Sequence, residues 1–249
     1  MKVLVVLPTY NEADNIERIL SAVRDALPEA GILVVDDGSP DGTAEIAERM
    51  GEKVGGVEIL RRTAKEGLGS AYKAGFRWGL DRDWDAFVEM DSDFSHDPAA
   101  LPELVAPLQR DVDLSVGSRY VPGGKIPNWS LSRRLLSRGG NIYADVLLGL
   151  GVKDSTAGFR AYRAEILRKI DLGSVRAEGY GFQIEMVRQV VGHGGKVAEV
   201  PISFTDRVSG ESKMSTWIVV EAFMLVTWWA AQRALDSVRR LRRRASLPA

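Results

Sequence analysis

The first half of the chain alternates short apolar runs with segments of helical periodicity. The apolar runs typical of strands buried on both faces occupy residues 2–8, 32–37, 57–62, 85–91 and 112–120. Between the first two runs, five apolar residues keep helical spacing, namely Ile16, Ile19, Leu20, Val23 and Leu27. Strands alternating with helices predict an α/β, Rossmann-like fold, in which a mostly parallel central sheet is flanked by helices.

Further helices are predicted at residues 44–50, 67–80 and 98–108. The second half of the chain is less regular. Residues 130–151 read as a helix interrupted by Gly139-Gly140, and residues 154–163 as a polar loop leading into a helix at 164–170. The pattern then predicts a helix from residue 179 to a glycine-rich end near 195, and a sixth strand at 196–204.

Polar clusters follow four of the predicted strands. They are Thr9 to Glu12, Asp36-Asp37, Asp91 to Asp93, and Ser118-Arg119. Each cluster alone is typical of turn residues and helix caps. Because ligands of open α/β sheets bind beyond the carboxyl ends of the strands, four clusters on one edge predict a binding site there.

The last part of the chain differs in composition. Residues 214–232 contain no Lys or Arg and three tryptophans, and six arginines follow between Arg233 and Arg244. Glu221 would cost roughly 2.5–3.5 kcal/mol at a bilayer centre, so we expect an amphipathic helix lying on the membrane surface rather than crossing it. The alternative is a helix packed on protein. The expected organisation is a catalytic domain at 1–213, with halves 1–112 and 113–213, and a membrane-associating segment at 214–249.

The net charge of −1 conceals an uneven distribution. Residues 1–112 hold 12 Lys and Arg against 22 Asp and Glu, whereas residues 113–249 hold 21 against 12. The first half is therefore suited to a cation and the second to an anion such as phosphate or an anionic membrane. The absence of cysteine excludes thiolate chemistry, and two histidines make a histidine-based metal site improbable.

The aspartates of "FVEMDSDFSHDP" carry the first specific hypothesis. Asp91 and Asp93 repel each other unless a positive group lies between them, and both can reach one octahedral cation. Mg²⁺ or Mn²⁺ prefers such oxygen ligands and completes its shell with phosphate oxygens. The chain lacks a glycine-rich dinucleotide fingerprint after the first strand, a P-loop and a nucleophile elbow.

A series of motifs in order from about residue 3 to 216 resembles one family. The motifs are "PTYNEADNI", "VVDDGSPDGT", "GLGSAYKAGF", "MDSDFSHDP", "GSRYVPGG", "SRRLLSRGGN", "DSTAGFRAYR", "GYGFQIEM" and "FTDRVSGESKMS". Together they resemble polyprenyl-phosphate (dolichyl-phosphate) mannose synthase, an inverting family-2 glycosyltransferase of the GT-A fold. "MDSD" and "VDDGSPDGT" alone would indicate only the broad glycosyltransferase class.

The resemblance implies a role for individual residues. It implies nucleotide binding by Pro8, Tyr10, Glu12, Val35, Asp37, Ser92, Arg207 and Lys213. It implies metal binding by Asp91 and Asp93, with Ser95 at a position where some members have a glutamine ligand. It implies contact with the acceptor phosphate by Arg119, Arg133, Arg134 and Ser137, with Arg133 and Arg134 equally plausible. The catalytic set is then Asp91, Asp93 and Arg119, and Arg207 and Lys213 lie in a loop closing over the site.

The implied reaction transfers mannose from GDP-mannose to a polyprenyl phosphate with inversion, using Mg²⁺ or Mn²⁺ at the cytoplasmic face of a membrane. We expect a peripheral protein on an anionic surface, with no nucleic-acid partner and no obligate protein partner. Three alternatives are a UDP-glucose-dependent polyprenyl-phosphate glucosyltransferase, a sugar nucleotidyltransferase and a non-catalytic nucleotide-sugar-binding subunit. The intact Asp91, Asp93 and Arg119 argue against the non-catalytic subunit.

Overall fold

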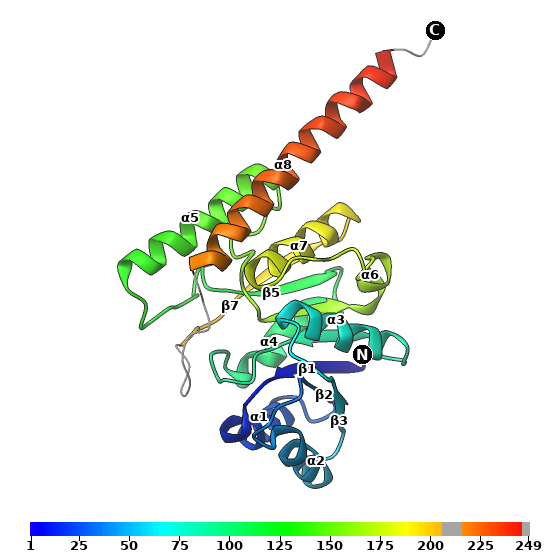
Figure 1. The fold of residues 1–249 in the computed structure, drawn as a ribbon, viewed down its shortest axis with the longest axis vertical. Coiled ribbons are helices and arrows are strands. Elements are labelled where there is room, and N and C mark those ends of the chain that lie inside the picture. Colours follow the sequence, from blue (N-terminus) through cyan, green and yellow to red (C-terminus); the bar gives the residue numbers. More distant parts are fainter. Residues whose placement is uncertain (206–215, 246–249) are drawn as a thin grey trace.

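A single seven-stranded sheet runs through both halves of the chain (Figure 1). The computed structural model describes residues 1–205 and 216–245, and within the last helix the side chains of 218–235. The strands are β1 (Val3–Thr9), β2 (Gly31–Asp36), β3 (Val57–Arg61), β4 (Ala86–Glu89), β5 (Leu114–Ser118), β6 (Arg160–Arg163) and β7 (Val197–Pro201). Their order is β3-β2-β1-β4-β6-β5-β7, and only β6 runs antiparallel to its neighbours among these strands.

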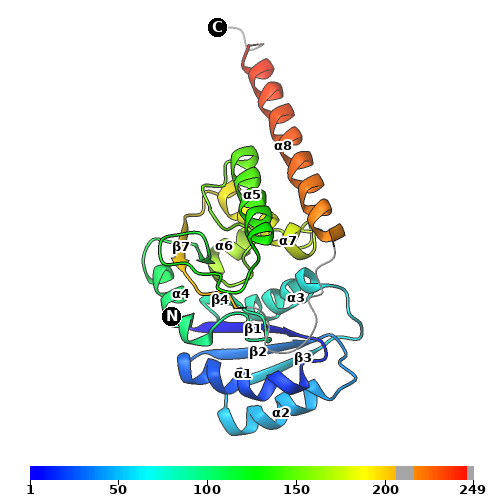
Figure 2. The same ribbon diagram turned by 90° about the vertical axis from the view of Figure 1, so that its left-hand side faces the viewer.

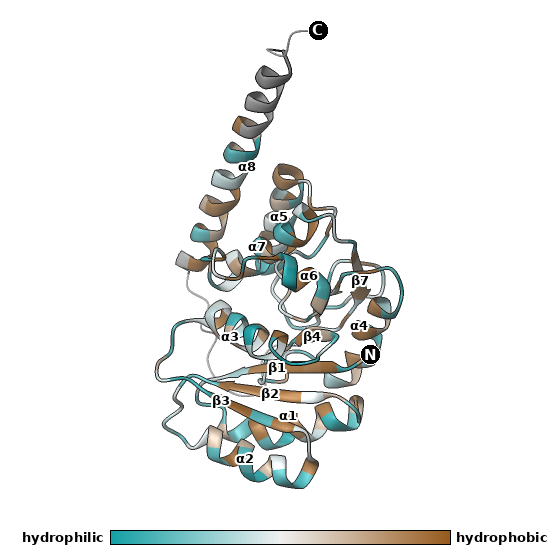
Figure 3. Ribbon diagram, turned by 90° about the vertical axis from the view of Figure 1, so that its right-hand side faces the viewer, coloured by the Kyte–Doolittle hydropathy of each residue, from teal (hydrophilic) through white to brown (hydrophobic). Residues whose placement is uncertain are grey.

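Helices cover both faces of the sheet. They are α1 (Ala13–Ala26), α2 (Thr43–Val54), α3 (Leu68–Leu80), α4 (Leu101–Val105), α5 (Leu131–Leu148), α6 (Ala164–Lys169), α7 (Gly179–Gly192) and α8 (Thr216–Ala245). Helices α1 and α2 lie on the opposite side of the sheet from α3, and the apolar strands lie between them (Figures 2 and 3). Two apolar clusters result, one on each face of the sheet. The predicted α/β fold with a mostly parallel sheet is confirmed.

Strand β6 was not predicted, because residues 154–163 were expected to form a polar loop. It is four residues long and has an arginine at each end, so it lacks the apolar run that marks the other central strands. Arg160 is nevertheless fully buried, and it donates hydrogen bonds to the carbonyl oxygens of Ser155, Ala157 and Gln183 at 2.6–2.7 Å. Those backbone acceptors satisfy a charge that a hydropathy pattern places outside the core.

Two predicted helices also differ in detail. Residues 131–148 form one continuous helix, so the interruption expected at Gly139-Gly140 is wrong. Gly140 faces α8, where Phe223 comes within 3.9 Å of the position a Cβ would occupy. The helix predicted at 98–108 is instead a 3₁₀ turn (Pro98–Ala100), α4 and a second 3₁₀ turn (Ala106–Gln109). Pro107 lacks the backbone N–H that a continuing α-helix needs.

Helix α8 packs by one face on the rest of the protein and extends beyond it (Figures 1 and 2). Ala222, Val226 and Trp229 are buried against α5 and α7. The Tyr143 hydroxyl lies 2.7 Å from that of Thr227, and Arg233 donates to the Leu148 carbonyl. Within the described residues, Ile218–Leu235 is the one segment long and apolar enough to cross a membrane by length and composition, with 11% of it buried.

Candidate active site

A cavity of about 770 Å³ opens at the carboxyl ends of β1, β2, β4 and β5. Strand β5 points the same way as β4, because β6 is antiparallel to both. The parallel strands therefore bring together the four polar clusters expected on one edge of the sheet. The cavity is of the size class that binds a small molecule of nucleotide-sugar dimensions.

The turn after β1 forms one wall of the cavity. Asn11 has φ +59°, a left-handed conformation that asparagine tolerates, and the chain turns there so that Tyr10 and Glu12 both line the cavity. The Glu12 carboxylate accepts a hydrogen bond from Asn15 Nδ2 at 3.0 Å, and its backbone N–H donates to Thr43 at 2.9 Å. Lys65 lies 4.4 Å from the centre of the Tyr10 ring.

Asp37 lies on the adjacent wall, after β2. Arg62 Nη1 is 2.9 Å from its Oδ1, and both side chains are largely buried. Burial raises the pKa of Asp37, although the Arg62 guanidinium opposes this. The Asp37 carboxylate is thus partly shielded from water, which suits it to accept hydrogen bonds from the N–H groups of a nucleobase.

Asp91, Ser92 and Asp93 follow β4 and form the cavity floor. Asp93 Oδ1 accepts from the backbone N–H of Ser95 at 3.0 Å, and Asp91 Oδ1 accepts from the Tyr72 hydroxyl at 3.3 Å. Phe94 has φ +59°, which is uncommon for a bulky residue and marks local strain beside the two aspartates. This turn holds the two carboxylates one residue apart in the same wall.

A buried ionisable pair begins two residues before Asp91 in the chain. Glu89 is fully buried in β4 and pairs in register with Arg160 of β6. Burial raises the pKa of Glu89 to about 7, and Arg160 opposes the shift. His96, stacked 5.1 Å from Phe159, has its pKa lowered to about 4 by burial, so it is neutral near pH 7. Burial therefore shifts both side chains toward their neutral forms.

Arg119 lies at the end of β5 and is held by Asp154. Its Nε and Nη2 donate to the two carboxylate oxygens at 2.7 and 2.6 Å, and Nη2 also donates to the Thr156 hydroxyl at 2.9 Å. Burial would lower the pKa of Arg119, but the Asp154 carboxylate outweighs this and raises it. A bidentate, buried pair fixes the plane of the guanidinium at the cavity wall.

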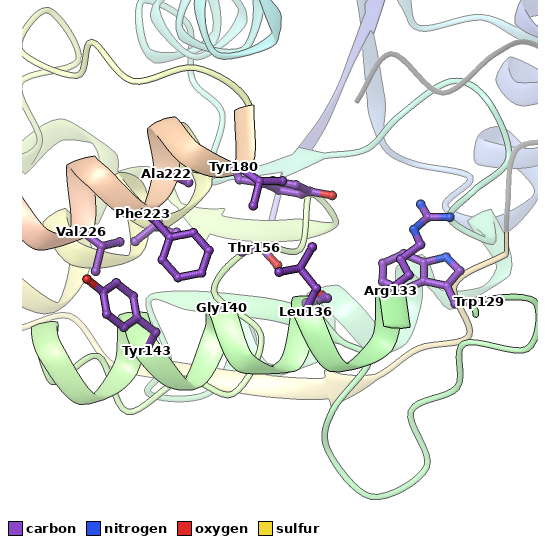
Figure 4. Close-up of a pocket in the computed structure, with 13 residues that line it drawn as sticks. Trp129, Arg133, Leu136, Gly140, Tyr143, Thr156, Tyr180, Ala222, Phe223 and Val226 are labelled. Carbon is purple, nitrogen blue, oxygen red and sulfur yellow. The ribbon is translucent and has the colours of Figure 1, made fainter. Parts of the chain in front are cut away.

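A second, apolar cavity of about 70 Å³ lies beside the first (Figure 4). It lies between α5, α7 and α8, and the rings of Tyr143 and Phe223 pack against each other in its lining, with 5.0 Å between their centres. Four residues line both cavities, namely Trp129, Arg133, Thr156 and Tyr180. The Arg133 guanidinium lies 3.9 Å from the centre of the Trp129 ring at this junction. The larger cavity, named the polar chamber for its charged side chains, thus shares a wall with the smaller apolar chamber.

The structure brings most of the predicted site residues together. Those that line one or both cavities are Pro8, Tyr10, Glu12, Asp37, Asp91, Ser92, Asp93, Ser95, Arg119, Arg133 and Ser137. Val35 is buried within β2 and lines neither cavity. Arg134 also lies outside both, and its Nη2 donates to the carbonyls of Ile126 and Pro127, which favours Arg133 over Arg134 at the cavity. Arg207 and Lys213 fall outside the described residues.

Other cavity residues were not predicted. Thr156 and Tyr180 line both cavities, and Asp154, which orients Arg119, belongs to the same polar segment as Thr156. Asp154 and Thr156 belong to the motif "DSTAGFRAYR", and Tyr180 belongs to "GYGFQIEM". The signal was therefore present, but only the fold shows which of these side chains face the site.

Comparisons with known proteins agree with this geometry. Residues 4–171 match the family model of glycosyl transferase family 2. The chain is 49% identical over 239 residues to an undecaprenyl-phosphate mannosyltransferase of Micrococcus luteus, covering 96% of this chain and 98% of the relative. It is 47% identical to a polyprenol monophosphomannose synthase of Mycolicibacterium smegmatis, covering 96% and 90%.

A more distant relative and a solved structure extend the comparison. A dolichol-phosphate mannosyltransferase of Pyrococcus furiosus is 38% identical over 92% of this chain and 64% of its own length. The crystal structure of glucosyl-3-phosphoglycerate synthase from Mycobacterium tuberculosis, with Mn²⁺, UDP-glucose and phosphoglyceric acid, shares the fold at a TM-score of 0.69. Its sequence is 20% identical, and the match covers 92% of this chain and 80% of the chain in the crystal structure. The chain therefore belongs to glycosyl transferase family 2, in the group of polyprenyl-phosphate mannosyltransferases.

Proposed function

We propose that this protein transfers mannose from GDP-mannose to the phosphate of a polyprenyl phosphate, with inversion, at the cytoplasmic surface of a membrane. The observation that carries the proposal is the junction of two unlike cavities. The polar chamber, with two aspartates and Arg119, adjoins the apolar one, and Trp129, Arg133, Thr156 and Tyr180 line both. A lipid phosphate has a polar head and an apolar chain, so its two parts match the two chambers.

The donor is proposed to bind in the polar chamber. Asp37 would accept from the base, and the β1 turn with Tyr10 and Glu12 would enclose the nucleoside. Asp91 and Asp93 would hold Mg²⁺ or Mn²⁺. Among the described residues no group of three or more His, Cys, Asp or Glu side chains is placed to hold an ion, so diphosphate oxygens and water would complete the shell. When bound, the cation supplies charge neutralisation to the departing diphosphate.

The acceptor phosphate is proposed to lie beside Arg119 and Arg133. Asp154 orients the Arg119 guanidinium, and Arg133 stands at the mouth of the apolar chamber. A phosphate monoester is already anionic near neutral pH, so its oxygen attacks the anomeric carbon without a strong general base. The protein's main contribution is then to hold two anions in line against their repulsion.

The membrane surface is proposed to receive α5 and α8 together. Large apolar side chains are exposed on both helices, namely Leu131, Leu135, Leu136, Ile142, Val146 and Leu147 of α5, and Val220, Met224, Trp228 and Leu235 of α8. An exposed apolar surface of this extent marks an interaction site. Arg133, Arg134 and Arg138 add positive charge on α5, which suits the anionic cytoplasmic leaflet. The apolar chamber lies between the same two helices (Figure 4).

A radiolabel assay tests the proposal. Purified protein is incubated with labelled GDP-mannose, Mg²⁺ and a short polyprenyl phosphate, and the label in the organic phase is counted. We expect transfer that EDTA and the Asp91→Ala variant abolish and that excess UDP-glucose does not reduce. Transfer from UDP-glucose instead would support the glucosyltransferase, and no transfer from either donor would support a binding subunit.

A further inference from the structure

Asn141 lies in the middle of α5 and is buried, with 1% of its surface exposed. Its Nδ2 donates to the Thr156 hydroxyl at 3.1 Å and to the Ser137 carbonyl at 3.0 Å. Its Oδ1 accepts from the Ser155 hydroxyl at 3.0 Å and from the Thr156 backbone N–H at 3.2 Å. The amide therefore uses both of its ends to fix residues 155 and 156 to α5.

The same short segment holds Arg119. The Thr156 hydroxyl accepts from Arg119 Nη2 at 2.9 Å, and Asp154 accepts from Nε and Nη2. Glu199 of β7 anchors the start of the segment, accepting from the backbone N–H groups of Lys153 and Asp154 at 2.9 and 3.0 Å. A continuous chain of hydrogen bonds thus runs from α5 through Asn141 and Thr156 to the guanidinium of Arg119.

Helix α5 is also one of the helices that carry the exposed apolar surface and line the apolar chamber. We propose that Asn141 is a positioning residue for the acceptor phosphate, which transmits the placement of α5 to Arg119 through Thr156. This inference rests on the proposed function, because it takes the ligand of Arg119 to be a phosphate. A displacement of about 1 Å in a group that aligns a reactant can cost about 100-fold in rate.

The donor side offers a matched control. Asn15 is a buried amide in α1, and its Nδ2 donates to the Glu12 carboxylate at 3.0 Å in the wall proposed to enclose the nucleoside. Asn15→Ala removes the same chemical group as Asn141→Ala, and the two asparagines are similarly buried. It should therefore affect the donor and not the acceptor.

The experiment measures kcat/KM for a short and a long polyprenyl phosphate, KM for GDP-mannose, the Kd of GDP and the melting temperature. The variants are Asn141→Ala, Thr156→Val, their double mutant and Asn15→Ala. We expect Asn141→Ala to lower kcat/KM for both acceptors by about 10- to 100-fold, with the donor KM and the Kd of GDP within about twofold. Thr156→Val keeps the shape of the side chain and tests the same link if Asn141→Ala folds poorly.

Because both residues act along one chain, the double mutant should lose little more than either single variant. Additive losses would overturn the path through Thr156. Equal losses in kcat/KM for the acceptors and in donor binding would overturn the positioning role. A loss confined to the long acceptor would also overturn it, because it would indicate that Asn141 affects binding of the lipid chain in the apolar chamber. Failure of the wild-type protein to transfer mannose while still binding GDP would instead overturn the proposed function.

Discussion

The two sides of the cavity are built by different means. On the side proposed to bind the donor, Tyr10, Asp37, Asp91 and Asp93 stand within four residues of the ends of parallel strands, so neighbouring strands bring them together. On the side proposed to bind the acceptor, the Arg119 guanidinium is held by Asp154 and Thr156, which are 35 and 37 residues away along the chain. The comparison teaches that the sheet places the backbone on both sides, whereas the direction of the Arg119 guanidinium depends on side-chain contacts that can be broken one at a time.

The largest expected effect is on the donor side. Asp93→Asn keeps the size of the side chain and its hydrogen bond from the Ser95 N–H, but it removes the charge that would hold a divalent cation. We expect turnover to fall by at least about 1,000-fold, because metal ions contribute several kcal/mol of charge stabilisation. The measurement is label transfer at saturating Mg²⁺, and a loss smaller than tenfold would contradict a metal role for Asp93.

The next-largest effect is expected when one contact is removed on the side proposed to bind the acceptor. Asp154→Asn leaves Arg119 buried without its counter-charge, and we expect a loss of roughly 3–5 kcal/mol in the free energy of unfolding. Chemical denaturation measures this. The control is Glu165→Gln, which removes an exposed carboxylate 3.9 Å from Arg163 and should cost less than about 1 kcal/mol. Equal losses in the two variants would show that burial of the Arg119–Asp154 pair is unimportant.

A third effect concerns His96, a buried residue that lines the larger cavity. Its folded-state pKa of about 4 is below the unfolded value of 6.5, so the folded state binds this proton more weakly. The associated stability is fully present above pH 6.5 and is lost as the pH falls towards 4, by roughly 3 kcal/mol. Unfolding measured at pH 7 and pH 4 should show a smaller difference in His96→Asn than in the wild type. The same difference in both proteins would exclude His96 as its source.

The smallest expected effect tests the exposed apolar surface of α5 and α8, which is proposed to bind the membrane. Trp228 is 55% exposed on α8, and Trp228→Glu should weaken binding to anionic vesicles by about tenfold. Sedimentation with vesicles measures the binding, and the melting temperature should stay unchanged because the side chain packs on little protein. Gln109→Glu adds the same charge at an exposed position away from α5 and α8 and serves as the control. Equal weakening by both would point to charge alone.

The sequence predicted the donor side better than the acceptor side, for a physical reason. Apolar runs locate strands, and parallel strands place the residues after them on one edge, so Asp37, Asp91 and Asp93 could be grouped without a structure. Strand β6 escaped prediction because the buried Arg160 is satisfied by backbone carbonyl groups, one of them 23 residues away at Gln183, that a hydropathy pattern does not reveal. The choice between Arg133 and Arg134 likewise depends on which one faces Trp129, which helical spacing alone leaves open.

The pairing of Arg119 with Asp154 has a consequence for ionic strength. The pair has no net charge, so Arg119 can orient an incoming phosphate but does not attract it from a distance. That attraction comes instead from more exposed cations such as Arg134 and Arg138, whose field extends only about 8 Å in physiological salt. Added salt should therefore slow the capture of the acceptor, while the alignment of a phosphate already beside Arg119 stays the same.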